Sequence, residues 1–203
     1  MDYPIYIIDN FLPEKIAEEF NSKFFEKTQW SNGWNRGLDP NQEQKWNWHR
    51  SVGIDLQNIY DTQSYLDSLE PEIRTLWDFT EEEIDRLFQV KHKMDRYYAN
   101  SHTYGLDGSM HSDDGHVTAL YYPCKNWDIN WDGGTAFYNY EKDDIIKYAS
   151  YKYNRIVLFK ADIPHKAMPV SRECYELRTS VVFKTSMDTN HSSYVTWYNN
   201  RKK

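Results

Sequence analysis

The chain has 203 residues, a formal net charge of −7, 39% hydrophobic residues and 17% aromatic residues. This composition excludes a disordered chain and predicts one domain with one core. The acidic balance disfavours a nucleic-acid partner, because surfaces that follow phosphates are usually basic. The apolar run near the N-terminus is too short to cross a bilayer, and the two cysteines, Cys124 and Cys174, are expected to be reduced. We therefore expect a soluble cytoplasmic protein without nucleic-acid or membrane partners.

The first elements in chain order are a strand and an amphipathic helix. "YPIYIIDN", residues 3–10, is rich in β-forming residues and ends in two turn-forming ones. In residues 12–30, Ile16, Phe20 and Phe24 recur at helical spacing and predict one buried stripe.

The next region combines a polar segment with a second helical one. Residues 31–50 are rich in Asn, Gly, Gln and Asp, which predicts a long loop or a loop that leads into a strand. Residues 64–90 read as helix with a break near Pro71 or near Thr80. Thr80 and Glu83 have the spacing of a capping box, which would start a new helix there.

From about residue 93 the pattern changes to short β-branched and aromatic runs separated by turn residues. The expected strands are 93–99, 117–123, 134–140, 154–161 and 177–185. Helices followed by many short strands predict an α+β fold, a jelly roll or double-stranded β-helix with N-terminal supporting helices. The expected division is an N-terminal part, 1–92, a jelly-roll core, 93–186, and a C-terminal extension, 187–203, all within one domain.

"GSMHSDDGH" in residues 108–116 has the ligand types of a metal site. His111 and Asp113 are two residues apart, so on a strand they would share a face, and His165 follows a later apolar strand and could supply a third ligand. Two imidazoles and one carboxylate are typical of non-haem Fe(II) oxygenases. The spacing of His111 and Asp113 alone is weak evidence, and for that spacing by itself a polar strand end is the better explanation. His116 is a less favoured alternative ligand, since an interval of five residues places it on the other face.

Arg178 lies in "LRTSVVFKT", an otherwise apolar strand. A buried Arg requires an anionic partner, and its guanidinium binds a carboxylate through two parallel hydrogen bonds. Ser180 shares its face and could bind the same anion. A structural ion pair with an acidic residue of the chain is the alternative.

These motifs together resemble the Fe(II)/2-oxoglutarate-dependent oxygenases, and most closely the prolyl 4-hydroxylase group with its oxygen-sensing branch. The matching order is H-x-D, "VTALYYPCKNWDINWDGGTAFYNY", "NRIVLFKADIPHKAMPV", and then an Arg in a strand. The resemblance implies that His111, Asp113 and His165 bind Fe(II) and that Arg178 binds the far carboxylate of 2-oxoglutarate. It also implies that Tyr122 and Tyr98 line the cosubstrate pocket.

The resemblance further implies a dioxygenase that uses Fe(II), 2-oxoglutarate and O2, with ascorbate as an accessory reductant. Its expected substrate is a prolyl residue in a protein or peptide. Two alternatives stay open: the same chemistry on a free amino acid or another small molecule, and a non-catalytic cupin-like binding module.

The segment 30–48 is a candidate lid, because the oxygen-sensing branch carries a mobile loop at this place. Trp34 and Trp46 could supply apolar contacts to a proline ring. The alternative is that the tryptophans at its ends belong to the core.

Overall fold

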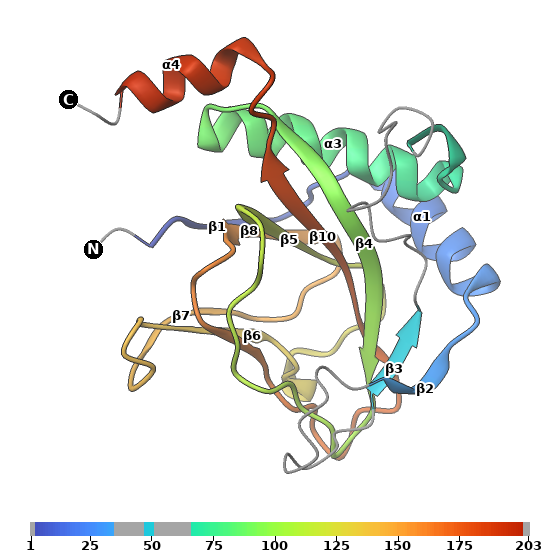
Figure 1. Ribbon diagram of the computed structural model, residues 1–203. Helices are drawn as coiled ribbons and strands as arrows, with labels where there is room; N and C mark the ends of the chain where they lie inside the picture. The colour runs from blue at the N-terminus through green and yellow to red at the C-terminus, as the bar shows by residue number, and fades with distance from the viewer. Residues whose placement is uncertain (1–2, 35–46, 51–65, 201–203) are drawn as a thin grey trace.

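Two antiparallel sheets and the helices packed on them make up residues 3–34, 47–50 and 66–200, the part of the chain that the computed structural model describes (Figure 1). The larger sheet has the strand order β1-β8-β5-β10-β4-β3-β2. Its strands are β1 (Ile5–Ile8), β2 (Ser31–Trp34), β3 (Asn47–Arg50), β4 (His92–His102), β5 (Val117–Tyr122), β8 (Arg155–Lys160) and β10 (Arg178–Met187). The smaller sheet has the order β7-β6-β9 and contains β6 (Thr135–Tyr138), β7 (Ile145–Ala149) and β9 (His165–Ala167).

From β4 onward the chain alternates between the two sheets. Strands β4, β5, β8 and β10 belong to the larger sheet, and the segments between them contribute the smaller one. The segment before β5 also joins the smaller sheet, through a bridge between His111 and His165 and a hydrogen bond from the Gly108 N–H to the Ala167 carbonyl. This alternation is the winding of a double-stranded β-helix, so the predicted fold class is confirmed.

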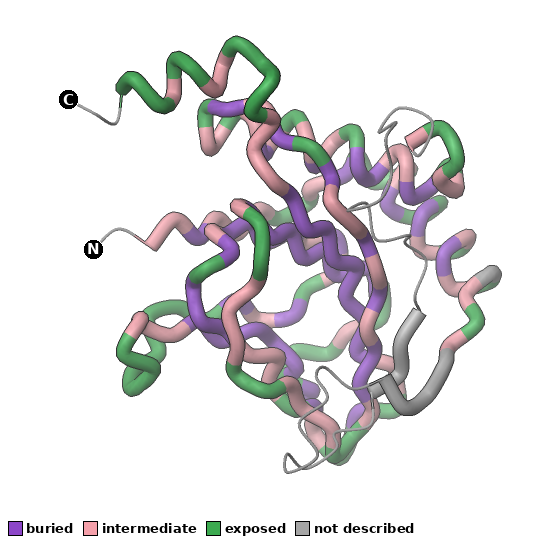
Figure 2. Tube along the Cα trace, viewed as in Figure 1, coloured by how far each residue is buried: buried purple, intermediate pink, exposed green. Residues whose placement is uncertain are grey.

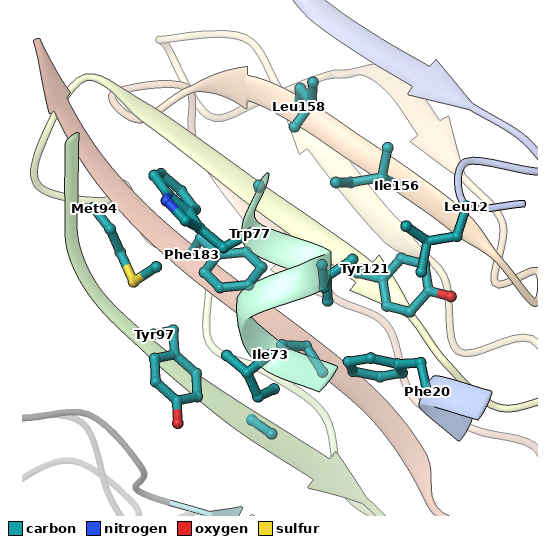
Figure 3. Packing of buried hydrophobic residues seen from close by; sticks show 14 of the residues in the cluster. Leu12, Phe20, Ile73, Trp77, Met94, Tyr97, Tyr121, Ile156, Leu158 and Phe183 are labelled. Atoms are coloured by element: carbon teal, nitrogen blue, oxygen red, sulfur yellow. The ribbon is translucent and has the colours of Figure 1, made fainter. Parts of the chain in front are cut away.

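Two helices cover the outer face of the larger sheet. Helix α1 (Glu14–Lys27) buries Phe20 and Phe24 of the predicted stripe, whereas Ile16 is only partly buried and Ala17 beside it is fully buried. Helix α3 (Pro71–Phe88) begins with Pro71 in its first turn, where the missing N–H costs nothing. Figure 3 shows Phe20 and Trp77 reaching from these helices toward the sheet.

The alternation of side chains along the central strands separates two cores. In β10, Val181 and Phe183 face the helices, and the Phe183 ring lies 5.4 Å from that of Trp77. Val182 faces the interior between the sheets, where it packs with Phe137 of β6. Figure 2 shows the resulting band of buried residues through the middle of the larger sheet. The interior face of β10 is therefore the face on which a site between the sheets can be built.

The predicted helix start at Thr80 is wrong, although the break at Pro71 is correct. Thr80 is fully buried in the middle of α3, and its hydroxyl donates to the Leu76 carbonyl at 2.7 Å. A Thr hydroxyl inside a helix can donate to the carbonyl four residues earlier, so the spacing of Thr80 and Glu83 did not mark the start of a helix.

Other elements had no sequence prediction. Strand β7 forms from "IIKYA", whose residues are mostly exposed, and helix α4 (Ser192–Asn200) follows β10. The 3-10 turn η2 (Ile129–Trp131) precedes β6. Within the described residues, no helix combines the length and the apolar character that crossing a bilayer demands.

Candidate active site

Three potential metal ligands converge at one end of the interior. His111, Asp113 and His165 each place one ligand atom so that the three atoms lie within 4.8 Å of one another. The two imidazole rings are 4.4 Å apart between centroids. The Asp113 and His165 side chains are buried, whereas 31% of the His111 side chain is exposed. The cluster is therefore open to solvent on the His111 side.

The local structure around His111 and Asp113 differs from the prediction. The two residues lie in the segment between β4 and β5 and not on a regular strand. His111 exchanges two backbone hydrogen bonds with His165, and the Asp113 N–H donates to the Ala161 carbonyl at 2.7 Å. These backbone hydrogen bonds between distant segments bring the side chains together. The expected residues therefore converge, but through these bonds and not through the alternation of a regular strand.

Backbone carbonyls fix the tautomer of both imidazoles. Nδ1 of His111 lies 2.7 Å from the Ser109 carbonyl oxygen, and Nδ1 of His165 lies 2.9 Å from that of Ile163. A carbonyl only accepts, so both Nδ1 atoms carry the proton and both Nε2 atoms have free lone pairs for a metal. Burial lowers the pKa of His165, although Asp113 opposes the shift, and this favours the neutral, ligating form.

Asp113 is held ionised in this buried place. Burial alone would raise the pKa of its carboxyl, but the adjacent His111 and His165 side chains and the nearby Lys184 charge keep that pKa far below its usual range. Oδ2 also accepts a hydrogen bond from the Thr118 hydroxyl at 2.8 Å. The donor set of two neutral imidazoles and one carboxylate fits a divalent transition metal in a facial triad.

The alternative histidine lies elsewhere. The His116 ring stacks on His92, with Nδ1 of His116 2.7 Å from Nε2 of His92. Asp114 is exposed and forms an ion pair with Arg96. The structure thus places neither His116 nor Asp114 in the metal cluster.

Arg178 is a buried cation, 2% exposed, at the start of β10. Its Nε donates to the Gly133 carbonyl at 2.6 Å, and its terminal nitrogens make only long contacts, 3.5 Å to the Ser180 hydroxyl and 3.4 Å to the Thr135 hydroxyl. Among the residues that the structure describes, no carboxylate forms an ion pair with Arg178. The structural ion pair considered above is therefore not found there, and the guanidinium fork is suited to an anionic ligand.

Aromatic side chains surround this guanidinium. It lies 5.7 Å from the Tyr122 ring centroid and 5.8 Å from that of Tyr151, and these two rings stack on each other. The Tyr122 hydroxyl is 2.7 Å from that of Thr135. Burial raises the pKa of Tyr122, although Arg178 opposes the shift, so the phenol keeps its proton and can donate to an anion.

The remaining predicted site residues have mixed outcomes. Ser180 is buried beside Arg178, as expected. Tyr98 lies on β4 opposite Val182 and faces the interior, but its ring lies under the Lys184 ammonium. Trp46 and the side chain of Trp34 lie outside the described residues, so the lid stays a prediction. Trp30, at the start of that segment, packs against the helix-side core, as the alternative reading expected.

Sequence reasoning missed several residues of the site. Lys184 and Thr118 contact Asp113, while Thr135 and Tyr151 contact Arg178 or Tyr122. Strand alternation could have found two of them, because Lys184 shares a face with Arg178, and Thr118 shares one with Tyr122. Tyr151 lies outside any regular strand and had no such signal.

Gly115 is expected to be essential for the loop that carries Asp113. Its φ is +86°, and a Cβ there would lie 2.5 Å from the Thr185 carbonyl oxygen. We expect Gly115→Ala to lower the free energy of unfolding by about 1–3 kcal/mol and to weaken Mn(II) binding, measured by urea unfolding and by titration. Gly105→Ala is the matched control, because Gly105 has a φ of +85° and no atom within 4 Å of an added Cβ. Equal losses in both variants would contradict the close contact with β10.

Comparison with known proteins supports the fold. No family model and no curated protein sequence matches the chain. Among solved structures, it is similar to a prolyl hydroxylase from Trichoplax adhaerens in complex with a hypoxia inducible factor peptide fragment, with a TM-score of 0.58, 18% identity, and coverage of 91% of this chain and 84% of that one. A prolyl-4-hydroxylase from Pseudomonas putida matches with a TM-score of 0.54, 14% identity and coverage of 90% and 92%.

A third similar structure is named for a different reaction. The non-haem alpha-ketoglutarate-dependent epimerase SnoN from nogalamycin biosynthesis has a TM-score of 0.62, 10% identity, and coverage of 92% of this chain and 79% of that one. At these identities the similarity shows the fold, which hosts more than one reaction.

Proposed function

We propose that this protein is an Fe(II)- and 2-oxoglutarate-dependent dioxygenase, with the whole chain as one catalytic domain. The observation that carries the proposal is the pairing of a three-ligand cluster with Arg178, a buried cation for which the described residues supply no carboxylate. His111, Asp113 and His165 would hold the metal, and Arg178 would hold the far carboxylate of 2-oxoglutarate. The solved structures of the same fold, two prolyl hydroxylases and an alpha-ketoglutarate-dependent epimerase, support this assignment.

The chemistry supplied by bound Fe(II) is oxidation of a substrate C–H bond: 2-oxoglutarate, O2 and R–H become succinate, CO2 and R–OH. The residues of this chain have the supporting tasks. The carbonyls of Ser109 and Ile163 keep both Nε2 atoms available, and Thr118 holds Asp113 by Oδ2. Tyr122, Thr135 and Ser180 would donate hydrogen bonds beside Arg178, and the apolar interior around them excludes water.

The proposed substrate is a prolyl residue in a protein or peptide. It is supported by the resemblance of the motifs and by the two prolyl hydroxylases of similar fold, one of which is described with a peptide. Hydroxylation of a free amino acid or another small molecule is the second candidate. It is supported by the epimerase of the same fold, which is named for a reaction other than prolyl hydroxylation.

Measuring succinate release with defined substrates tests both the dioxygenase reaction and the prolyl substrate. The protein is incubated with Fe(II), ascorbate and 2-oxoglutarate, together with either a library of proline-containing peptides or a set of free amino acids. The proposal expects succinate and a product heavier by one oxygen atom, in the peptide arm if proline is correct. Oxygen gain only in the amino-acid arm would replace the substrate class, and no succinate in any arm would overturn the dioxygenase.

A lid function of segment 30–48 is proposed on sequence grounds only. Shortening residues 35–44 should reduce peptide hydroxylation far more than uncoupled decarboxylation of 2-oxoglutarate, and Trp34→Ala should do so more mildly. Equal losses in both reactions would contradict it.

A further inference from the structure

Lys184 is a buried lysine that contacts Asp113, one of the proposed metal ligands. It lies on β10 six residues after Arg178, on the same face of the strand, and is 2% exposed. Its ammonium forms an ion pair with Oδ2 of Asp113, lies 3.4 Å from the Thr118 hydroxyl and 6.0 Å from the centroid of the Tyr98 ring. A lysine is rarely fully buried unless it is paired, and Asp113 supplies the pair.

The two oxygens of Asp113 therefore have different surroundings. Oδ2 accepts from Thr118 and from Lys184 and lies 3.3 Å from Nε2 of His165, while Oδ1 lies 3.4 Å from Nε2 of His111. The Asp113 backbone is fixed separately by its bond to the Ala161 carbonyl. The orientation of the carboxylate thus has supports besides Lys184, and the distinctive contribution of Lys184 is its charge.

This charge changes the electrostatic balance of the interior. The three protein ligands, two neutral imidazoles and one carboxylate, together carry one negative charge. The ammonium of Lys184 cancels this charge. Arg178 adds a second cation on the same face of β10. Arg96 and Asp114 form an ion pair at the surface, so their charges cancel each other. A fixed cation repels a divalent metal ion and attracts a dianion, and both effects are strong at short range.

We propose that Lys184 is a positioning residue that neutralises Asp113, so that the site binds the metal together with a dianion in preference to the free metal ion. The proposal rests on the proposed function and deepens it, because it assigns the electrostatic preference of the same site to one residue.

The test uses the full-length protein, with Mn(II) and 2-oxoglutarate as probes in calorimetric titrations. Lys184→Met removes the charge and keeps a similar shape. We expect it to bind Mn(II) about tenfold more tightly and, when saturated with Mn(II), to bind 2-oxoglutarate about tenfold more weakly, the size expected when one nearby charge is removed from a partly solvated site. Lys184→Arg keeps the charge and should leave both constants within about threefold of the wild type.

Two further variants separate this effect from others. Lys184→Gln keeps an amide donor without the charge and must shift both constants in the same directions as Lys184→Met. Lys23→Met makes the same change of net charge on the exposed face of α1 and should shift neither. If both ligands bind more weakly in the Met and Gln variants, Lys184 is structural, and if neither constant moves, its charge has no role; either result overturns the proposal. A wild type that binds neither Mn(II) nor 2-oxoglutarate would instead overturn the proposed function, and this proposal with it.

Discussion

Replacing His111 with Ala is expected to abolish stoichiometric Mn(II) binding while the fold survives. His111 is the most exposed of the three proposed ligands, so its removal opens little core, but it leaves only two ligand atoms. Outer-shell partners alone are typically worth 10–100-fold in metal affinity, so the loss of a ligand should weaken binding by at least about 100-fold. Titration of Mn(II), with circular dichroism as the test of folding, measures this effect.

His116→Ala is the matched control, because His116 belongs to the same loop but pairs with His92. It should bind Mn(II) like the wild type. His165→Ala should lose binding as His111→Ala does, whereas Asp113→Ala is a poorer test because it leaves Lys184 buried without its carboxylate. Normal binding by His165→Ala, together with loss in His116→Ala, would show that the third ligand is misassigned.

Replacing Arg178 with Ala is expected to raise the Kd for 2-oxoglutarate by about 10–100-fold. A hydrogen bond to a charged group contributes about 1.5–3 kcal/mol, which corresponds to this range. Arg178→Lys should be intermediate, because the charge stays while the planar fork is lost. The Kd is measured by titration of the Mn(II)-loaded protein, and the KM in turnover should follow it.

Arg172→Ala is the control for this change. Arg172 is exposed, with its guanidinium over the Tyr104 ring, so its loss should leave 2-oxoglutarate binding unchanged. Arg178 is itself buried, so the Ala variant is also expected to be less stable, and thermal unfolding separates that loss from the binding defect. An unchanged Kd in both the Ala and the Lys variants would remove Arg178 from the cosubstrate site.

The core strands were predictable because each carries its own local pattern. β5, β8 and β10 are short runs of β-branched and aromatic residues between turns, and Arg178 stood out because it interrupts such a run. β7 carries a similar run, "IIKYA", but its side chains are mostly exposed, and its pairing with β6 is what makes it a strand.

The site was predictable as a set of residue types but not as a geometry. Strand alternation alone would put His111 and Asp113 on one face, yet backbone hydrogen bonds to His165 and Ala161 position them. Strand alternation places Lys184 on the same face as Arg178, but it does not indicate a contact with Asp113. Only the pairing of β10 with β5, which sets the β10 interior face beside the start of β5, reveals that Lys184 meets Asp113. Contacts between segments distant in sequence carry no local pattern.

The measurement that tests the central claim most directly is calorimetric titration of 2-oxoglutarate into the protein with and without Mn(II). If the ligand cluster and Arg178 form one site, 2-oxoglutarate should bind with one-to-one stoichiometry when Mn(II) is present and far more weakly when it is absent. His111→Ala should then bind 2-oxoglutarate only as weakly as the metal-free wild type, with or without Mn(II). Binding that is equally tight with and without Mn(II), or absent under both conditions, would contradict a metal-dependent 2-oxoglutarate site.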